Sequence, residues 1–259
     1  MSWLEGNLHL PLLVVDPFGL HEYRKSPRLH PTFQIFPVEC NRGSKIYLNP
    51  TLPLVIPHIP RLNSFVVLSA TIPDILHHFR CHAPLLERLD IENTSPHIPI
   101  LDTTLFDDDL SSLRNLNLVR VATDLPWRSM ANLTVFKLSR PRGCEIMVDR
   151  LLDFLEFAPL LNTIHILDSI PNSSDAPPER IVPLHHLNAL TTTADRVLSL
   201  LNHLYIPTGT SLRLWTVFSG QVSPLLDYLP ETSPNIRNLS HITAVNLAFY
   251  PENKGVQLI

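Results

Sequence analysis

The sequence predicts an α/β fold, an irregular solenoid with a parallel β-sheet on one face and helices and loops on the other. Large apolar residues recur in one short pattern along most of the chain, and segments with helical spacing lie between the copies. The chain has 25 prolines and 7 glycines, which suits frequent connections between short elements. With 44% hydrophobic and 17% charged residues, it is expected to form a packed core.

The recurring pattern is L-x-x-L-x-L, in which other large apolar residues also occupy the L positions. Its central positions are 20 to 33 residues apart, mostly near the period of leucine-rich repeats. We expect a strand at each copy, and strands at this period are parallel because each connection returns the chain to the same edge. An ordinary α/β domain is the alternative. The central positions are Phe65, Leu89, Leu116, Phe136, Ile164, Leu190, Leu212 and Val245.

Helices are predicted in some of the connections between these strands. Residues 72–79, 147–157 and 197–204 have apolar residues at helical spacing. Pro84 and Pro159 lie a few residues beyond the first two segments, each within the sequence Ala-Pro-Leu-Leu. A proline at this place ends a helix before the next strand begins. The predicted order is therefore helix, stop, strand.

The domain organisation follows from where the pattern is regular. Residues 61–259 are expected to hold leucine-rich-repeat-like repeats, and residues 1–60 an irregular N-terminal part of the solenoid, such as a truncated cap. Within that part, residues 8–15 and 44–48 are candidate strands. The polar, proline-rich residues 171–179 predict an exposed excursion.

Charge and targeting signals argue against several classes of partner. The formal net charge is -4 and no run of basic residues is longer than Arg24-Lys25, so we expect no nucleic-acid partner. No cationic leader precedes the apolar residues 8–15, which are too few to span a bilayer, so we expect no membrane partner. Three widely separated cysteines favour a reducing compartment. The predicted location is intracellular, cytoplasmic or nuclear.

Reactive side chains do not form a recognisable catalytic pattern, so no enzyme activity, cofactor or metal is predicted. His77, His78, Cys81 and His82 are the densest cluster of potential zinc ligands, but no second ligand pair is spaced to complete a site, which favours surface histidines. Residues 107–109 are three adjacent aspartates, which cannot all converge on one ion and fit a solvated turn. A hydrolase or metalloenzyme would require His78, Cys81 and distant acids to meet in space.

The residues that flank the core positions form the candidate binding face. Side chains alternate along a strand, so these residues point away from the core. A mixture of charged groups, amides and one Trp is typical of protein-binding surfaces. The alternatives are a solvated or helix-covered sheet face, and a core position for Trp215. The candidate protein-binding residues are Arg88, Asp90, Asn115, Asn117, Lys137, His165, Thr191, Arg213, Trp215 and Asn246.

Four segments, 79–89, 125–138, 151–164 and 168–180, resemble the leucine-rich-repeat-like region of F-box proteins of basidiomycete fungi. The similarity covers most of the chain. It implies a substrate-recognition module that selects a target protein for a Skp-cullin ubiquitin ligase. The family's F-box begins with a Leu-Pro-x-Glu-like sequence, which is not found before Trp3. A Skp adaptor is thus expected only with an upstream F-box, and the alternative is an orphan leucine-rich-repeat scaffold protein with no ligase role.

Overall fold

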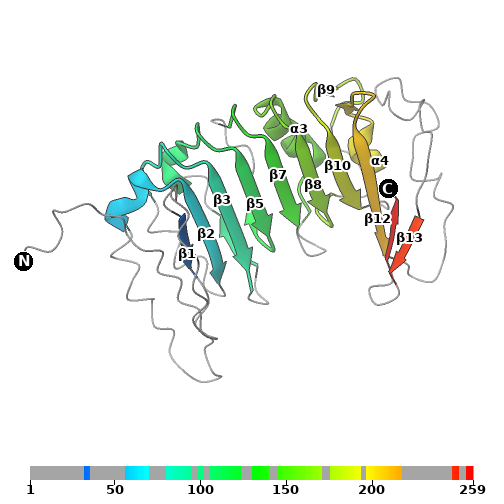
Figure 1. Cartoon of the computed structure of the whole chain (residues 1–259). Helices are drawn as coiled ribbons and strands as arrows, with labels where there is room; N and C mark the ends of the chain where they lie inside the picture. The colour runs from blue at the N-terminus through cyan, green and yellow to red at the C-terminus, as the bar shows by residue number, and fades with distance from the viewer. Residues whose placement is uncertain are drawn as a thin grey trace, which may run out of the picture.

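A computed structural model describes residues 32–35, 56–69, 80–94, 98–101, 105–123, 130–139, 145–170, 176–193, 197–217, 247–250 and 255–258. Over these ranges the chain has an α/β fold built on a ten-stranded sheet with few helices (Figure 1). The α/β class and the parallel sheet predicted from the pattern are therefore confirmed.

The main sheet adds its strands in chain order as far as β12. Every neighbouring pair from β1 to β12 is parallel, whereas β14 pairs antiparallel with both β12 and β13. The strands are β1 (Thr32–Ile35), β2 (Ser64–Ser69), β3 (Arg88–Asn93), β5 (Asn115–Val119), β7 (Val135–Ser139), β8 (Thr163–Leu167), β10 (Ala189–Thr193), β12 (Ser211–Val217), β13 (Leu247–Tyr250) and β14 (Gly255–Leu258).

The predicted central positions are backbone partners in this sheet. Phe65 pairs with Leu89 and Leu89 with Leu116, and the register continues through Phe136, Ile164 and Leu190 to Leu212. The pattern thus predicted these strands correctly. Val245, the last central position, lies outside the described residues. The prediction of a parallel repeat at the C-terminal end is wrong for β13, which is antiparallel to its neighbour.

A tight turn precedes most of these strands. The amide of Leu86 donates to the Ala83 carbonyl at 3.0 Å, and the same three-residue step joins Leu113 to Leu110 at 3.0 Å. One carbonyl after each turn then accepts two amides of the next turn: the Glu87 oxygen accepts from Arg114 and Asn115 at 2.8 and 2.9 Å. Matching bonds run from residue 63 to residue 211, so neighbouring turns are held in fixed register.

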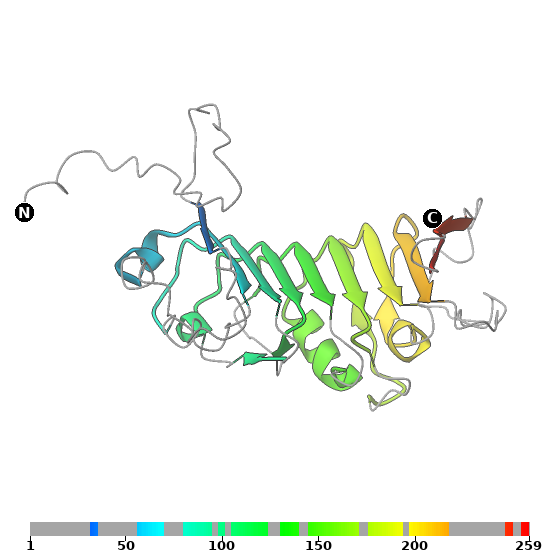
Figure 2. The ribbon, with the colours of Figure 1, turned by 90° about the horizontal axis from the view of Figure 1, so that it is seen from below.

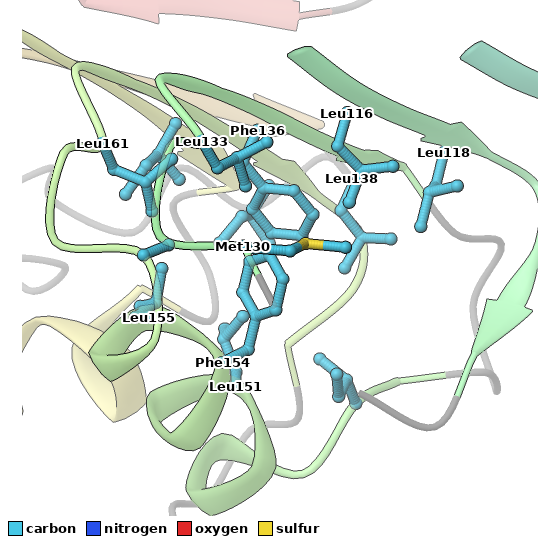
Figure 3. Close-up of a cluster of buried hydrophobic side chains, with 14 of the residues drawn as sticks. Leu116, Leu118, Met130, Leu133, Phe136, Leu138, Leu151, Phe154, Leu155 and Leu161 are labelled. Atoms are coloured by element: carbon cyan, nitrogen blue, oxygen red, sulfur yellow. The ribbon is translucent and has the colours of Figure 1, made fainter. Parts of the chain in front are cut away.

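The core lies between the sheet and the helices on one of its faces. The central residues of β2 to β10 are almost completely buried, and Leu212 of β12 is partly buried against them. α3 (Val148–Glu156) packs against this row, with the ring centroids of Phe136 and Phe154 4.6 Å apart. Figure 3 shows the side chains from β5, β7 and α3 converging around Met130. The alternate residues of each strand consequently face away from α3.

The connections contain less helix than the pattern predicts. α3 falls within the predicted residues 147–157, but α4 covers only Leu198–Leu201, and residues 72–79 lie outside the described part. Short strands and 3₁₀ turns fill the other described connections because prolines and aspartates there interrupt helical hydrogen bonding. These elements are η1 (Ile56–Arg61), β4 (Ile100–Leu101), η2 (Leu105–Asp108), β6 (Ala122–Thr123), β9 (Val182–Pro183) and β11 (Leu204–Tyr205).

The two faces of the sheet differ in what covers them. Figure 2 shows α3 and α4 on the same side of the sheet, and no described helix lies on the other side. The boundary drawn at residue 60 does not divide the sheet, since β1 pairs with β2 across it. The outward face from β2 to β12 is the surface on which the candidate residues lie, and it is called the sheet face below.

Candidate protein-binding face

Parallel register brings outward side chains of successive strands into rows on the sheet face. The central row joins Asp90 to Asn117, Asn117 to Lys137 and Lys137 to His165 as backbone partners. It continues from His165 through Thr191 to Arg213. A second row contains Arg88 and Asn115, which are also partners. Residues up to 125 positions apart in the sequence thus lie on one surface.

Seven of the ten candidate residues are exposed or partly exposed on this face. They are Arg88, Asp90, Asn115, Asn117, Lys137, His165 and Arg213. Two others cannot be placed in the same way: the side chain of Trp215 and all of Asn246 lie outside the described part, although the Trp215 backbone pairs with Thr193 in β12.

Thr191 is a correction to the predicted binding residues. It occupies the expected outward position, but only 4% of its surface is exposed. Thr191 is a short residue between the longer His165 and Arg213 in the row. Outward alternation predicted the direction of the side chain, whereas accessibility depends on the size of the residues on either side.

The first strands of the sheet face carry a charge pair that neutralises itself. The Arg88 guanidinium donates to one Asp90 carboxylate oxygen from Nη2 at 2.5 Å and from Nε at 2.9 Å. The Asp90 side chain is 13% exposed and that of Arg88 57% exposed, so the pair lies at the surface with its acid shielded. Glu92, on the same strand, is exposed.

The later strands carry basic groups. Lys137 and Arg213 are exposed, and His165 lies partly buried between their strands. Burial lowers the pKa of His165, and the positive charges of Lys137 and Arg213 lower it further. His165 is therefore mainly neutral near pH 7, and protonation would place a third positive charge in this row. Lys137, His165 and Arg213 are called the basic row below.

The sheet face also has apolar positions that the sequence reasoning did not single out. Val66, Val119, Val135 and Leu167 are partly buried and share the outward alternation of the polar candidates. Counting alternate positions from each central apolar residue would have found them. The face is thus a mixture of polar side chains and partly accessible apolar side chains, as at many protein interfaces.

A second polar cluster, on the other side of the sheet, was not predicted. Arg180 is only 19% exposed and contacts three carboxylates of α3: Asp149, Asp153 at 2.7 Å and Glu156 at 3.0 Å. Burial lowers the pKa of Arg180, but the hydrogen bonds to these acids outweigh that effect and raise the pKa above its usual value. The acids are spaced to share one face of α3, a signal that the sequence contained. This cluster joins the segment before β9 to the helix.

The residues considered for metal binding are described only in part. The ring nitrogens of His82 lie 3.9 Å from carboxylate oxygens of Asp107 and Asp109. Burial and the nearby Asp107 raise the pKa of Cys81, which keeps its thiol protonated at neutral pH. Within the described ranges, no group of three or more His, Cys, Asp or Glu side chains is placed to hold a metal. His77 and His78 lie outside those ranges.

The aspartates at 107–109 and the excursion at 171–179 are described in part. Asp107 is exposed and follows Phe106 with positive φ, consistent with a solvated turn. Pro177, Pro178 and Glu179 are exposed, while residues 171–175 lie outside the described part.

In comparison with known proteins, no family model, no curated protein and no solved structure matches the chain. No helix in the described ranges has the length and apolar character needed to cross a bilayer.

Proposed function

We propose that this chain is a leucine-rich-repeat-like solenoid that works as a protein-interaction module and binds its partner on the sheet face. The observation that carries the proposal is the register of β3 to β12. It aligns Asp90, Asn117, Lys137, His165 and Arg213 in one row on the face opposite α3.

The residue types found on the outward side of the strands support binding on this face over a purely structural role. The inward row needs large apolar residues to fill the core, whereas the outward row needs only residues compatible with a strand. Two asparagines at 115 and 117 are poor strand formers, yet they occupy consecutive outward positions of β5. Side chains with amide donors and acceptors at accessible positions provide hydrogen bonds to a partner protein.

The resemblance to F-box proteins extends the proposal to the fate of the partner. By that resemblance, the bound protein is a target for ubiquitination and a Skp-cullin ligase is recruited through an F-box. This part rests on the resemblance alone. The alternative, a scaffold protein with no ligase role, shares the same binding face, so the two are separated by which proteins are captured.

The test is affinity capture from a lysate of the source cells with the full chain and two matched variants. Asn115→Arg/Asn117→Arg places two large cations on the sheet face. Asn188→Arg/Asn202→Arg makes the same chemical change at two exposed positions outside the central row. Circular dichroism and thermal unfolding establish that both variants fold like the wild type.

A partner that binds the sheet face is expected to be captured by the wild type and the 188/202 variant and lost with the 115/117 variant. Equal capture of every protein by all three chains would refute the proposed face. Skp and cullin subunits among the captured proteins, with the chain extended by any upstream coding sequence, would support the ligase role. A face-dependent partner without those subunits would favour the scaffold.

A further inference from the structure

The charged groups of the sheet face are divided between its two ends. β3 carries Arg88, Asp90 and Glu92, and β5 carries no charged residue. β7, β8, β10 and β12 contain no acidic residue, and the charged or titratable groups within them are Lys137, His165 and Arg213. One end of the face is therefore mixed and the other is positive, although the whole chain has a net charge of -4.

Neither exposed cation of the basic row is neutralised in the part of the chain that the structure describes. Arg88 has Asp90 at 2.5 Å, but no described carboxylate lies within ion-pair distance of Lys137 or Arg213. Both cations also act on the same histidine between them, which places their charges within electrostatic reach of one position. Two like charges held at fixed positions on a rigid sheet are favourable for an anionic partner.

The spacing of the row limits the shape of that partner. β7 and β12 are separated by β8 and β10. Because neighbouring strands are about 4.8 Å apart, the backbones at Lys137 and Arg213 are about 14 Å apart. An extended peptide covers this distance with about four to five residues, at about 3.3 Å per residue. A peptide crossing the strands can therefore place one carboxylate at each cation.

We infer that the basic row Lys137, His165 and Arg213 binds an acidic, Asp/Glu-containing segment of the partner protein that crosses strands β7 to β12. This inference rests on the proposed function of the sheet face and names the chemistry of its partner.

The experiment measures fluorescence anisotropy of a labelled peptide in which Glu alternates with Ser, added to the full chain. The counterpart peptide has Gln at every Glu. The test variant is Lys137→Gln/Arg213→Gln. The control, Arg114→Gln/Arg150→Gln, also removes two positive charges, but from exposed positions outside the basic row.

At low ionic strength, the Glu peptide is expected to bind at least about tenfold more tightly than the Gln peptide. Added salt should weaken the binding of the Glu peptide. Loss of two partly screened charge pairs should weaken binding of the Glu peptide by about tenfold in the 137/213 variant. The control variant should change the affinity for the Glu peptide by less than about twofold.

Three results would overturn the inference: no preference for the Glu peptide, equal weakening by both variants, or tighter binding of a single-stranded oligonucleotide lost in the 137/213 variant. The proposed function is judged separately by partner capture. If the peptide fails but Asn115→Arg/Asn117→Arg still removes a partner, the sheet face binds protein without acidic selectivity. If neither test depends on the face, both proposals are wrong.

Discussion

At the scale of single residues, burial and hydrogen bonding divide the polar side chains of β10 into different roles. Thr192 points into the core and is fully buried, and among the described residues its hydroxyl has no hydrogen-bond partner. Thr193, next along the strand, accepts a hydrogen bond from the Asp168 amide at 2.9 Å. Adjacent threonines of one strand should therefore respond oppositely to loss of the hydroxyl.

We expect Thr192→Val to raise the free energy of unfolding by about 1 kcal/mol, because a buried hydroxyl without a partner carries an uncompensated desolvation cost. Thr193→Val is the control, and it should lower stability because it leaves the Asp168 amide without this acceptor. Urea unfolding of the three proteins measures both changes. A Thr192→Val protein less stable than the wild type would contradict the assignment.

The titration of His165 should make stability depend on pH. Its pKa in the folded chain is lowered by burial and by Lys137 and Arg213, so the unfolded chain binds more protons below the usual value near 6.5. The stabilising contribution is present above that value and is lost as pH falls below it toward the lowered pKa of the folded chain. In His165→Gln, the fall in melting temperature between about pH 7 and pH 5 should be smaller than in the wild type. An unchanged pH slope would refute this.

At the scale of elements, Arg180 connects α3 to the segment that leads into β9. Three carboxylates on one face of the helix converge on a side chain that is 19% exposed. The carboxylates themselves are 33% to 48% exposed, so solvent screens part of the interaction. The cluster holds the helix and the connection together, where no disulfide or metal does so among the described residues.

We expect Arg180→Gln to lower the free energy of unfolding by about 1 to 2 kcal/mol, below the value for a fully buried pair. Arg150→Gln removes an exposed arginine from the same helix and should change stability by less than about 0.5 kcal/mol. Chemical unfolding distinguishes the two, and equal effects would show that the cluster contributes nothing specific.

Elements were predictable from the sequence where the apolar pattern is regular. The copies from Phe65 to Leu212 predicted the strands, and their central residues are aligned in the sheet because each must reach the same core. β1 was missed because His30 occupies the leading apolar position of its copy. The antiparallel β13 and β14 could not be inferred, since a single strand pattern does not specify the direction of its partner.

The candidate site was predictable to the same extent. Alternation along each strand is sufficient to place Lys137, His165 and Arg213 on one face. It did not predict that Thr191 is shielded or that Arg88 pairs with Asp90, because both depend on side-chain size and rotamer between neighbours. The Arg180 cluster was missed for a related reason: its residues come from two elements whose relative position the pattern does not define.

At the scale of the whole molecule, the sheet from β1 to β12 is a stack in which each strand pairs only with its neighbours in chain order. The register from β1 to β12 never skips a strand. Protection of the backbone amides from hydrogen exchange should therefore depend on position along the stack, since strands in the middle have a partner on both sides and a filled core below.

Hydrogen exchange followed by mass spectrometry tests this. We expect the amides of β7 and β8, beside the Phe136 and Phe154 contact, to exchange more slowly than those of the edge strand β1. The Phe154→Ala variant should accelerate exchange most in β7 and β8 and least in β2, because coupling is between neighbours. Equal acceleration throughout the sheet would indicate a single cooperative unit instead.

Because hydrogen bonds in the turns fix where each strand begins, insertions or deletions in the connections and substitutions on the sheet face can occur independently. Carbonyls such as those of Glu87, Arg114 and Asn162 define where the next strand starts, while the connections between them differ in length by several residues. Residues can thus be inserted or deleted in a connection without altering which side chains are neighbours on the sheet face. A lineage could then revise its binding surface one strand at a time, each substitution altering one position while the rest of the surface remains as it was.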